Sequence, residues 1–136
     1  MKIAAKICAA LLAAAPFAGF CAPSQTVNAF KNVAALIKTG NIEQLVKQME
    51  PQVELLLLNV DKTCNQEQAH ALLTDFVQKN LIINFSMIHV GGKEERCFGI
   101  GLLSTESGKF RVTVFIRVDS KTGAYTIQQL KVENEN

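Results

Sequence analysis

Three side chains of types that can transfer protons stand among apolar residues: His89, Tyr125 and Glu54. His89 follows Phe85 and Met87 at alternate positions of an apolar run, in phase with Ile83. In a β-strand this spacing puts them all on one face. If that face lines a cavity, His89 could act as a general base at its mouth. The interpretation that we favour is a histidine at a strand end with its ring half in solvent.

Tyr125 and Glu54 allow the same pair of interpretations. Tyr125 is the only tyrosine of the chain and could donate a hydrogen bond to a ligand, although an aromatic residue near the start of a strand more often serves packing. Glu54 interrupts an apolar run, and burial would make it a candidate acid; a glutamate on an edge strand that faces water explains the pattern equally well. The walls of a pocket would be apolar, and the candidates are Phe85, Met87, Val112 and Val114.

Cysteine chemistry is the third possibility. Of four cysteines, Cys8 and Cys21 lie within the first 21 residues, which leaves Cys64 and Cys97 as a pair that could form a disulfide in an oxidising compartment. Two separately buried thiols are the alternative that we favour. Cys97 and His89 are expected to approach only diagonally across neighbouring strands, without a third group to orient them as nucleophile and base. Zinc and iron sites need three or four converging ligands, so we expect no metal and no cofactor.

The N-terminus has the three zones of a secretory signal peptide over residues 1–21: a basic start, an apolar run from Ile7 to Phe20, and a cleavage region. Gly19 and Cys21 occupy the two positions that must be small if cleavage follows Cys21. The run is shorter than the ~20 residues that span a bilayer. We therefore expect an exported protein, periplasmic or extracellular and without a membrane span after leader removal, in which residues 22–136 form a single domain.

The net charge of +2 belongs to the leader. Lys2 and Lys6 are two of the 14 basic residues, which leaves the expected domain with 12 basic and 12 acidic side chains. Binding to nucleic acid or to anionic lipid normally requires a basic surplus. We expect neither partner.

Apolar residues recur at helical spacing in three segments. Ser24 is the expected N-cap of the first, and Gly40 its left-handed stop. Asn41 predicts the cap of a short second helix that ends by Pro51. Asn65, followed three residues later by a glutamine, predicts a capping box for the third. The apolar positions of the three helices are Val27, Phe30, Ala34 and Ile37; Ile42, Leu45, Val46 and Met49; and Ala69, Leu72, Leu73, Phe76 and Val77.

Five segments predict strands. One runs from Val53 to Val60, between the second and third helices. The four others, joined by short turns that predict an antiparallel meander, are Leu81 to Val90, Cys97 to Ser104, Phe110 to Asp119 and Ala124 to Val132. The fold class is therefore α+β, with three N-terminal helices packed on a mostly antiparallel sheet in the order α-α-β-α-β-β-β-β.

Alternation within these strands assigns side chains to the two faces of the sheet. Phe110, Val112, Val114 and Ile116 are expected to face the helices, and Gly99 and Gly101 to lie opposite them on the same inner face. The other residues of these two strands form the outer face, and because several of them are apolar, this face is expected to bind a partner. The apolar phase also breaks near Gln128 and Gln129, which predicts a β-bulge that bends the sheet. The outer set is Phe98, Ile100, Leu102, Arg111, Phe115 and Arg117.

Several short strings, mostly core and turn positions, carry a likeness to known proteins. They are Gly40-Asn41, Pro51 with Val53-Glu54-Leu55, Gln68-Ala69, Leu73 with Asp75-Phe76, Gly101 with Leu103, Gly108 with Phe110-Arg111-Val112, and Ile127 with Leu130 and Val132-Glu133.

Through these strings the chain resembles a family of short exported bacterial proteins, mostly from Bacteroidetes, which is classified only as a domain of unknown function. The resemblance implies an NTF2-like fold, a strongly bent sheet wrapped on helices to form a cone. The wider superfamily includes isomerases, dehydratases and epoxide hydrolases, but no Asp, Tyr and His arrangement of theirs maps onto this sequence.

The absence of a catalytic constellation and the two-sided apolar sheet predict a non-catalytic binding or interaction domain that forms a homodimer through its outer face. The alternative is a cone that binds a small apolar molecule, or an isomerase-like or hydrolase-like enzyme, with His89, Tyr125 or Glu54 at its mouth. A weaker third interpretation is a subunit of an envelope assembly, bound to another envelope protein.

Overall fold

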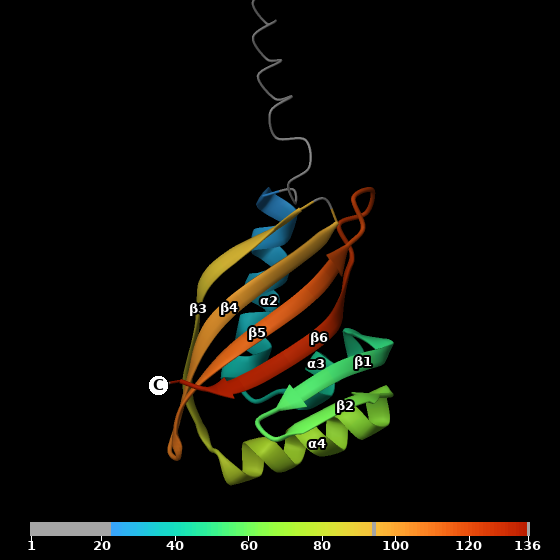
Figure 1. The fold of residues 1–136 in the computed structure, drawn as a ribbon. Helices are drawn as coiled ribbons and strands as arrows, with labels where there is room; N and C mark the ends of the chain where they lie inside the picture. The colour runs from blue at the N-terminus through green and yellow to red at the C-terminus, as the bar shows by residue number, and fades with distance from the viewer. Residues whose placement is uncertain (1–22, 94, 136) are drawn as a thin grey trace, which may run out of the picture.

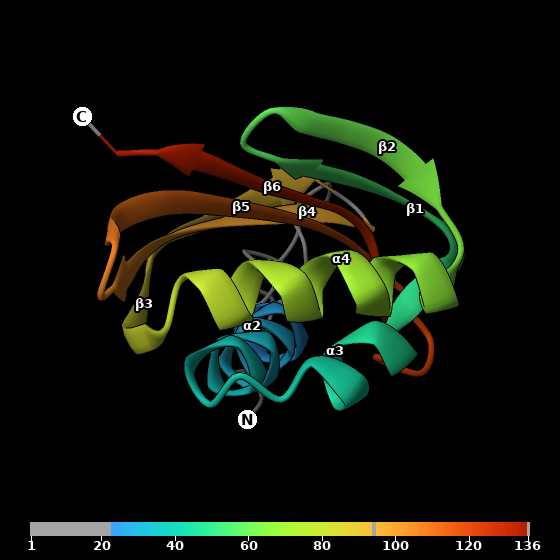
Figure 2. The ribbon, with the colours of Figure 1, turned by 90° about the horizontal axis from the view of Figure 1, so that it is seen from below.

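The computed structural model describes residues 23–93 and 95–135, so the expected leader lies outside the described residues. Six strands form one sheet in the order β2-β1-β6-β5-β4-β3. All neighbouring strands are antiparallel except β1 and β6, which run parallel. The sheet is strongly curved, and its concave face carries all three described helices (Figure 2). The strands are β1 (Met49–Leu57), β2 (Val60–Cys64), β3 (Ile82–Lys93), β4 (Arg96–Thr105), β5 (Gly108–Val118) and β6 (Tyr125–Asn134).

The helices are α2 (Pro23–Lys38), α3 (Ile42–Lys47) and α4 (Gln66–Lys79). Gly40 has a φ of 69° and makes the predicted left-handed stop after α2. The Asn41 side chain caps α3 by accepting a hydrogen bond from the Gln44 amide at 3.3 Å. Two predicted ends are wrong: α2 begins at Pro23, so Ser24 lies inside its first turn, and α3 ends before Pro51, which belongs to β1.

The capping box predicted for α4 is confirmed. The Asn65 side chain accepts from the Gln68 amide at 2.8 Å, and the Gln68 side chain accepts from the Asn65 amide at 3.0 Å. These two bonds satisfy amide donors that a helix start otherwise leaves without a partner. The helix therefore begins where the sequence predicts.

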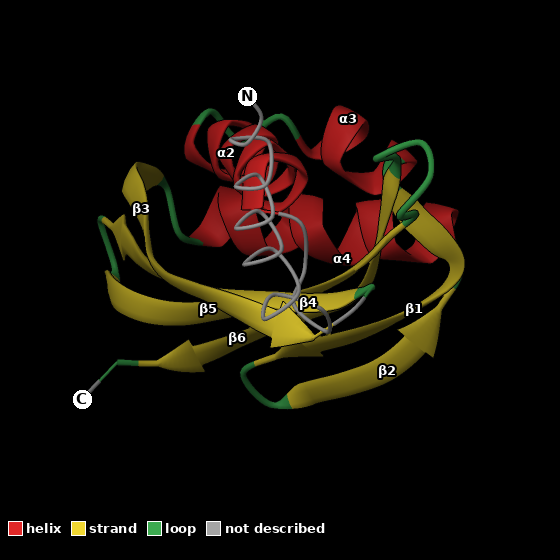
Figure 3. Cartoon of the chain, turned by 90° about the horizontal axis from the view of Figure 1, so that it is seen from above, coloured by secondary structure: helices red, strands yellow, loops and turns green. Residues whose placement is uncertain are grey.

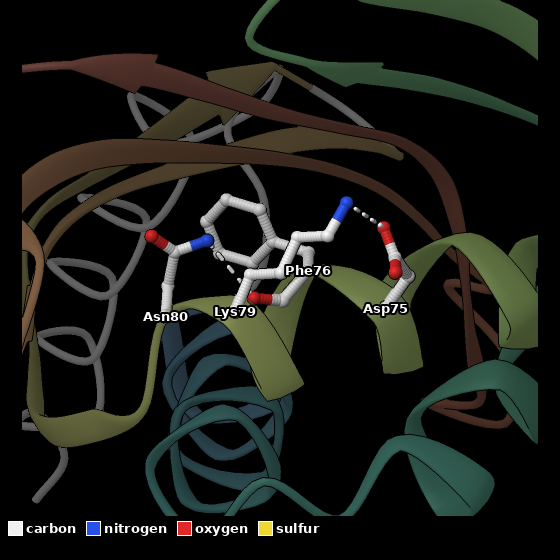
Figure 4. Close-up of polar contacts among 4 residues, drawn as sticks. All are labelled: Asp75, Phe76, Lys79 and Asn80. Atoms are coloured by element: carbon white, nitrogen blue, oxygen red, sulfur yellow. Dashed lines mark hydrogen bonds and ion pairs between the residues drawn. The ribbon is translucent and has the colours of Figure 1, made fainter.

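The other end of α4 is closed by Asn80 (Figure 4). Its side-chain amide and its backbone N–H each donate to the Phe76 carbonyl oxygen at 2.9 Å. The Phe76 ring packs edge-on against Phe110 of β5, with ring centroids 5.4 Å apart. An exposed ion pair of 3.2 Å joins Asp75 and Lys79 on the same turn. Phe76, and not the ion pair, anchors this end of the helix to the sheet.

The strand predicted from Val53 to Val60 is a hairpin instead (Figure 1). Its two-residue turn is Leu58 and Asn59, and Leu58 has a φ of 56°, which non-glycine residues seldom adopt. Four successive leucines hid this turn, because no glycine or proline marks it. The element order is therefore α-α-β-β-α-β-β-β-β. Among the described residues, α2 and α3 precede β1 and α4 follows β2, so the expectation of three N-terminal helices is not confirmed.

The core fills the space between the helices and the concave face. Gly99 and Gly101 let two rings lie directly on β4: a Cβ at Gly99 would stand 2.7 Å from the Phe30 ring, and one at Gly101 would overlap the Phe85 ring. The predicted bulge is also present, since Phe115 pairs with Gln129 while Ile116 pairs with Ile127, which leaves Gln128 as the extra residue. Glycines and a bulge together allow the sheet to wrap around α2.

Candidate interaction face and the interior of the sheet

The outer face of β3, β4 and β5 carries an aromatic strip made by His89, Phe98 and Phe115. Phe98 pairs directly with Phe115 across the two strands, and their ring centroids are 6.3 Å apart. The His89 ring lies 5.7 Å from the Phe98 ring on the other side. In Figures 2 and 3 this face of the sheet has no described helix over it. The strip is therefore a row of half-exposed and exposed rings on the outer face.

The pairing of β4 with β5 confirms the predicted faces. Gly99 and Gly101 alternate with Phe98, Ile100 and Leu102, which are half-buried and point outward. On β5 the alternate residues Arg111 and Phe115 are exposed, as is Arg117. These outward residues are the same set that the sequence assigned to the outer face.

The predicted placement of His89 on the inner face is wrong. Met87 pairs with Gly101 and His89 pairs with the next residue, Ile100, so Ile88 is an extra residue in β3. A bulge of one residue moves every later side chain to the opposite face. His89 is consequently exposed on the outer side, where its ring contacts Phe98.

A second bulge lies at the start of β3. Ile82 pairs with Thr105 and Asn84 with Ser104, so Ile83 is the extra residue there. Ile83 is 63% exposed and Ile88 is 68% exposed, the two highest values among the large apolar side chains described. The alternation of β3 gives no sign of either bulge, because it assigns Ile83 to the same face as Phe85 and Met87 and Ile88 to the opposite one.

A shallow hollow of about 380 Å³ lies beside the aromatic strip, where the β6 bulge opens the outer surface. Its lining mixes rings, amides and charges: Glu54, Arg96, Phe98, Phe115, Gln128 and Gln129. Glu54 pairs with Gln129 across β1 and β6 and is exposed. The structure thus puts Glu54 on the outer face and not in a pocket inside the cone. Glu54 faces water as the second interpretation proposed, but its strand β1 is not an edge strand, because β2 lies at that edge of the sheet.

The two outer arginines are held by carboxylates of their own chain. Arg111 Nε lies 3.4 Å from a carboxylate oxygen of Glu135, and Arg117 Nε lies 3.4 Å from one of Glu50. Thr126 donates its hydroxyl to the same Glu50 carboxylate at 3.0 Å. These pairs flank the aromatic strip along β5 and bring both signs of charge to one face.

The expected inner-pocket walls belong to the core. Phe85, Val112 and Val114 are buried, and Met87 packs against them half-buried. Val112 also borders an apolar void of about 30 Å³ between α4 and the sheet. That volume is about the share of one water molecule and cannot hold a metabolite.

Tyr125 lies at the open end of the sheet and joins three elements. Its hydroxyl donates to the side-chain oxygen of Gln48, at the end of α3, and a hydrogen bond also links it to Asn32 of α2. Burial raises the pKa of the Tyr125 phenol, and the bond with Asn32 opposes that rise. Tyr125 is half-buried and borders a polar groove along the turn between β5 and β6. The structure thus supports the packing interpretation of this residue.

The two cysteines of the described domain differ in state. Cys64 is a buried free thiol, so the predicted alternative of a Cys64–Cys97 disulfide is wrong. Burial raises the pKa of the Cys64 thiol, while nearby Lys62 opposes the rise. Cys97 is disulfide-bonded, which also corrects the favoured expectation of two separate thiols. Cys97 and His89 point to opposite faces of the sheet and do not come together.

The described residues offer neither a metal-binding cluster nor a helix that could span a membrane. Within residues 23–93 and 95–135, no group of three or more His, Cys, Asp or Glu side chains could hold a metal ion. No helix in this part of the chain is long and apolar enough to cross a membrane.

The combination of a bent six-stranded sheet, helices on its concave face and bulges that produce the bend matches proteins of known structure. A family model described as "Domain of unknown function (DUF4783)" matches residues 30–133. The chain belongs to the DUF4783 family. A DUF4783 protein from Bacteroides ovatus ATCC 8483 is 30% identical, with a TM-score of 0.70 over 76% of this chain and 93% of that one.

Other DUF4783 and NTF2-like structures agree. A family member from Bacteroides uniformis ATCC 8492 is 27% identical, with a TM-score of 0.71 over 78% of this chain and 96% of that one. The protein "Rd1NTF2_04 with long sheet" is 16% identical, with a TM-score of 0.63 over 77% of this chain and 97% of that one. At that identity the likeness shows the fold alone, and the fold of this DUF4783 domain is NTF2-like. No curated protein sequence matches the chain.

Proposed function

We propose that this domain is a non-catalytic interaction module whose partner is a second copy of the chain, bound through the outer face of the sheet. The observation that carries the proposal is the aromatic strip of His89, Phe98 and Phe115, with Ile100 and Leu102 beside it. Phe115 is 36% exposed in the middle of a strand. Aromatic side chains in such a position contribute most when a partner removes them from water.

The charges around the strip favour a second copy over a partner of strongly basic or acidic character. A two-fold interface brings one surface against itself, so that surface must offer both signs of charge. Arg111 and Arg117 stand on the outer face with Glu50, Glu54 and Glu135 near them. The arginines are already oriented by Glu135 and Glu50, which lowers the entropy that they would lose at the rim of an interface.

The interior gives less support to the alternative of a ligand-binding or catalytic cone. The inner residues Phe85, Val112 and Val114 pack in the core, and His89 and Glu54 lie on the outer side. Tyr125 remains at the open end of the sheet, where its hydroxyl binds Gln48. His89 on β3 and Glu54 on β1 share the outer face but have β4, β5 and β6 between them, so the candidate acids and bases do not converge.

Sedimentation equilibrium of the exported protein at micromolar concentration tests this proposal. We expect a dimer for the natural sequence and a monomer for Phe115→Glu, because the new carboxylate would be buried without a partner. Leu81→Glu is the matched control: Leu81 is 52% exposed and lies outside the strip, so this variant should remain a dimer.

Phe115→Ser provides a milder second variant, and circular dichroism verifies that each variant is folded. A natural protein that stays monomeric, or a Phe115→Glu variant that is folded and still dimeric, would refute the outer-face dimer. Stoichiometric co-purification with a much larger envelope protein, in place of self-association, would assign the strip to that protein instead.

A further inference from the structure

The outer face of the sheet is divided into two halves of opposite charge. β3, β4 and β5 contain no acidic residue, and their outer side is called the positive half below. The acidic residues of the described strands all lie on β6, β1 and β2, whose outer side is the negative half. In the strand order the two halves meet between β5 and β6 (Figure 1). The basic residues of the positive half are Lys93, Arg96, Lys109, Arg111 and Arg117, and the acidic residues of the negative half are Glu50, Glu54, Asp61 and Glu133.

Three cations of the positive half stand side by side. Lys93 pairs with Arg96, and Arg96 pairs with Arg117, so these side chains form one row across β3, β4 and β5. All three are exposed, and the row lies next to the rings of Phe98 and Phe115 on the same face. Like charges directly opposite each other on neighbouring strands destabilise a sheet. An acidic surface placed over this row would offset the repulsion.

The negative half presents carboxylates on the same outer face. Glu54 and Asp61 are exposed at outward positions of β1 and β2. Lys62 alternates with Asp61 and so belongs to the inner side of the sheet. Lys131 does lie on the outer face, but its ammonium group is 3.8 Å from a carboxylate oxygen of Glu133 on the same strand. The charge that this half offers to a partner is therefore acidic.

The hollow beside the aromatic strip marks the line where the halves meet. Its volume is about 380 Å³, and both halves line it: Glu54 and Gln129 from the negative one, Arg96, Phe98 and Phe115 from the positive one. Glu54, Gln129, Phe115 and Phe98 follow one another in a single row across four strands. Along this row the surface changes from acidic to aromatic.

Symmetry allows such a face to meet itself in two ways. Two copies that join through the same sheet face are related by a two-fold axis in the plane of the interface. An axis across the strands puts the positive half of each copy on the positive half of the other. An axis along the strands exchanges the halves, so that each positive half covers a negative half.

We propose that the two-fold axis of the dimer runs along the boundary between β5 and β6. This inference rests on the outer-face dimer proposed above and adds the orientation of the second copy. The row that contains Lys93 and Arg96 then faces the side of the second copy that carries Glu50 and Glu54, and the hollows of both copies lie close to the axis. Complementary charge of this kind selects the partner and fixes its register.

Exchange of charge between the halves tests this orientation. Glu54→Lys with Asp61→Lys makes both halves positive, and Lys93→Glu with Lys109→Glu puts carboxylates on the positive half. No ion pair with another described residue holds any of these four side chains. Each pair of substitutions should raise the dissociation constant of the dimer by about tenfold or more at low salt, because like charges then face each other. All four substitutions in one chain exchange the two charges and should bring the constant back toward the natural value.

Glu43→Lys with Glu67→Lys is the matched control. Both carboxylates are exposed on the helices α3 and α4, on the other side of the sheet, so this variant should dimerise like the natural protein. Circular dichroism verifies that each variant is folded. A dimer that neither pair weakens, or that stays weak with all four substitutions, would overturn the orientation and leave the outer-face dimer in place. A natural protein that is monomeric would refute the outer-face dimer itself.

Spin labels at the two ends of the boundary give a second measurement. Lys109→Cys lies at one end of β5, and Thr126→Cys lies at the other end, on β6. Cys64 is buried, so native-state labelling is confined to the introduced cysteine. With the axis along the boundary, each label should lie within about 20 Å of its copy. An axis across the strands can bring only one end close and leaves the other label about 30 Å or more from its copy, so one long distance in a dimer would overturn the proposal.

Discussion

Gly99 offers a test of how the sheet meets α2, because its replacement by alanine puts two effects of known sign against each other. Glycine within a strand costs about 0.5–1 kcal/mol relative to alanine, so Gly99→Ala would stabilise the domain if space allowed. The new Cβ would instead stand 2.7 Å and 2.8 Å from two ring atoms of Phe30 and 3.0 Å from the Met87 sulfur. Overpacking of this kind costs about 1–3 kcal/mol.

Gly99→Ala should therefore lower the free energy of unfolding by about 1 kcal/mol or somewhat more, which is the cost of overpacking minus the gain from replacing a glycine in a strand. Phe30→Val removes both ring atoms, and the end of the Met87 side chain can shift. In the Phe30→Val background, Gly99→Ala should then become neutral or stabilising. The measurement is the urea midpoint of each variant with an unchanged m-value, arranged as a double-mutant cycle.

Gly101 is the control for this cycle. A Cβ there would meet the Phe85 ring and also the Ser86 carbonyl oxygen at 2.8 Å, and a backbone atom cannot move aside. Gly101→Ala should therefore remain destabilising when Phe85→Val removes the ring. An equal loss from Gly99→Ala in both backgrounds would refute the argument, since the Phe30 ring would not be its cause.

Two further predictions concern the helix caps and the single tyrosine. Asn65→Ala removes the capping bonds of α4 and should lower the free energy of unfolding by about 1 kcal/mol, whereas Asp75→Ala, which breaks an exposed ion pair, should change it by less than about 0.5 kcal/mol in denaturant unfolding. Equal effects would contradict the capping geometry. Tyr125 should ionise above the ordinary phenol pKa when phenolate absorbance is followed in the folded protein, because burial favours the neutral form. Since the folded pKa of Tyr125 is raised, its contribution to stability is present below pH ~10 and is lost as pH rises through the folded pKa. Tyr125→Phe should abolish that part of the pH dependence of stability. Ionisation of Tyr125 at the ordinary phenol pKa would disprove the prediction.

The sequence predicted those features that depend on neighbours along the chain. The Asn65 capping box is a pattern of residues three apart, and Gly40 is a residue that tolerates a left-handed backbone. Alternation in β4 and β5 predicted the inner and outer faces correctly, because these two strands pair with each other along their whole length without a bulge. The bulge at Gln128 could also be predicted, because the apolar residues before and after it occupy opposite phases of the alternation.

The tertiary structure decided what depends on neighbours across the sheet. An extra residue at Ile88 sends His89 outward, and nothing in the alternation of β3 itself marks that residue. The turn at Leu58 is visible only once β2 pairs with β1. The exclusion of Cys64 from a disulfide likewise depends on which strands lie side by side. Periodicity reports the face of a side chain only while register is kept, and register is fixed by the pairing of whole strands around a bent sheet.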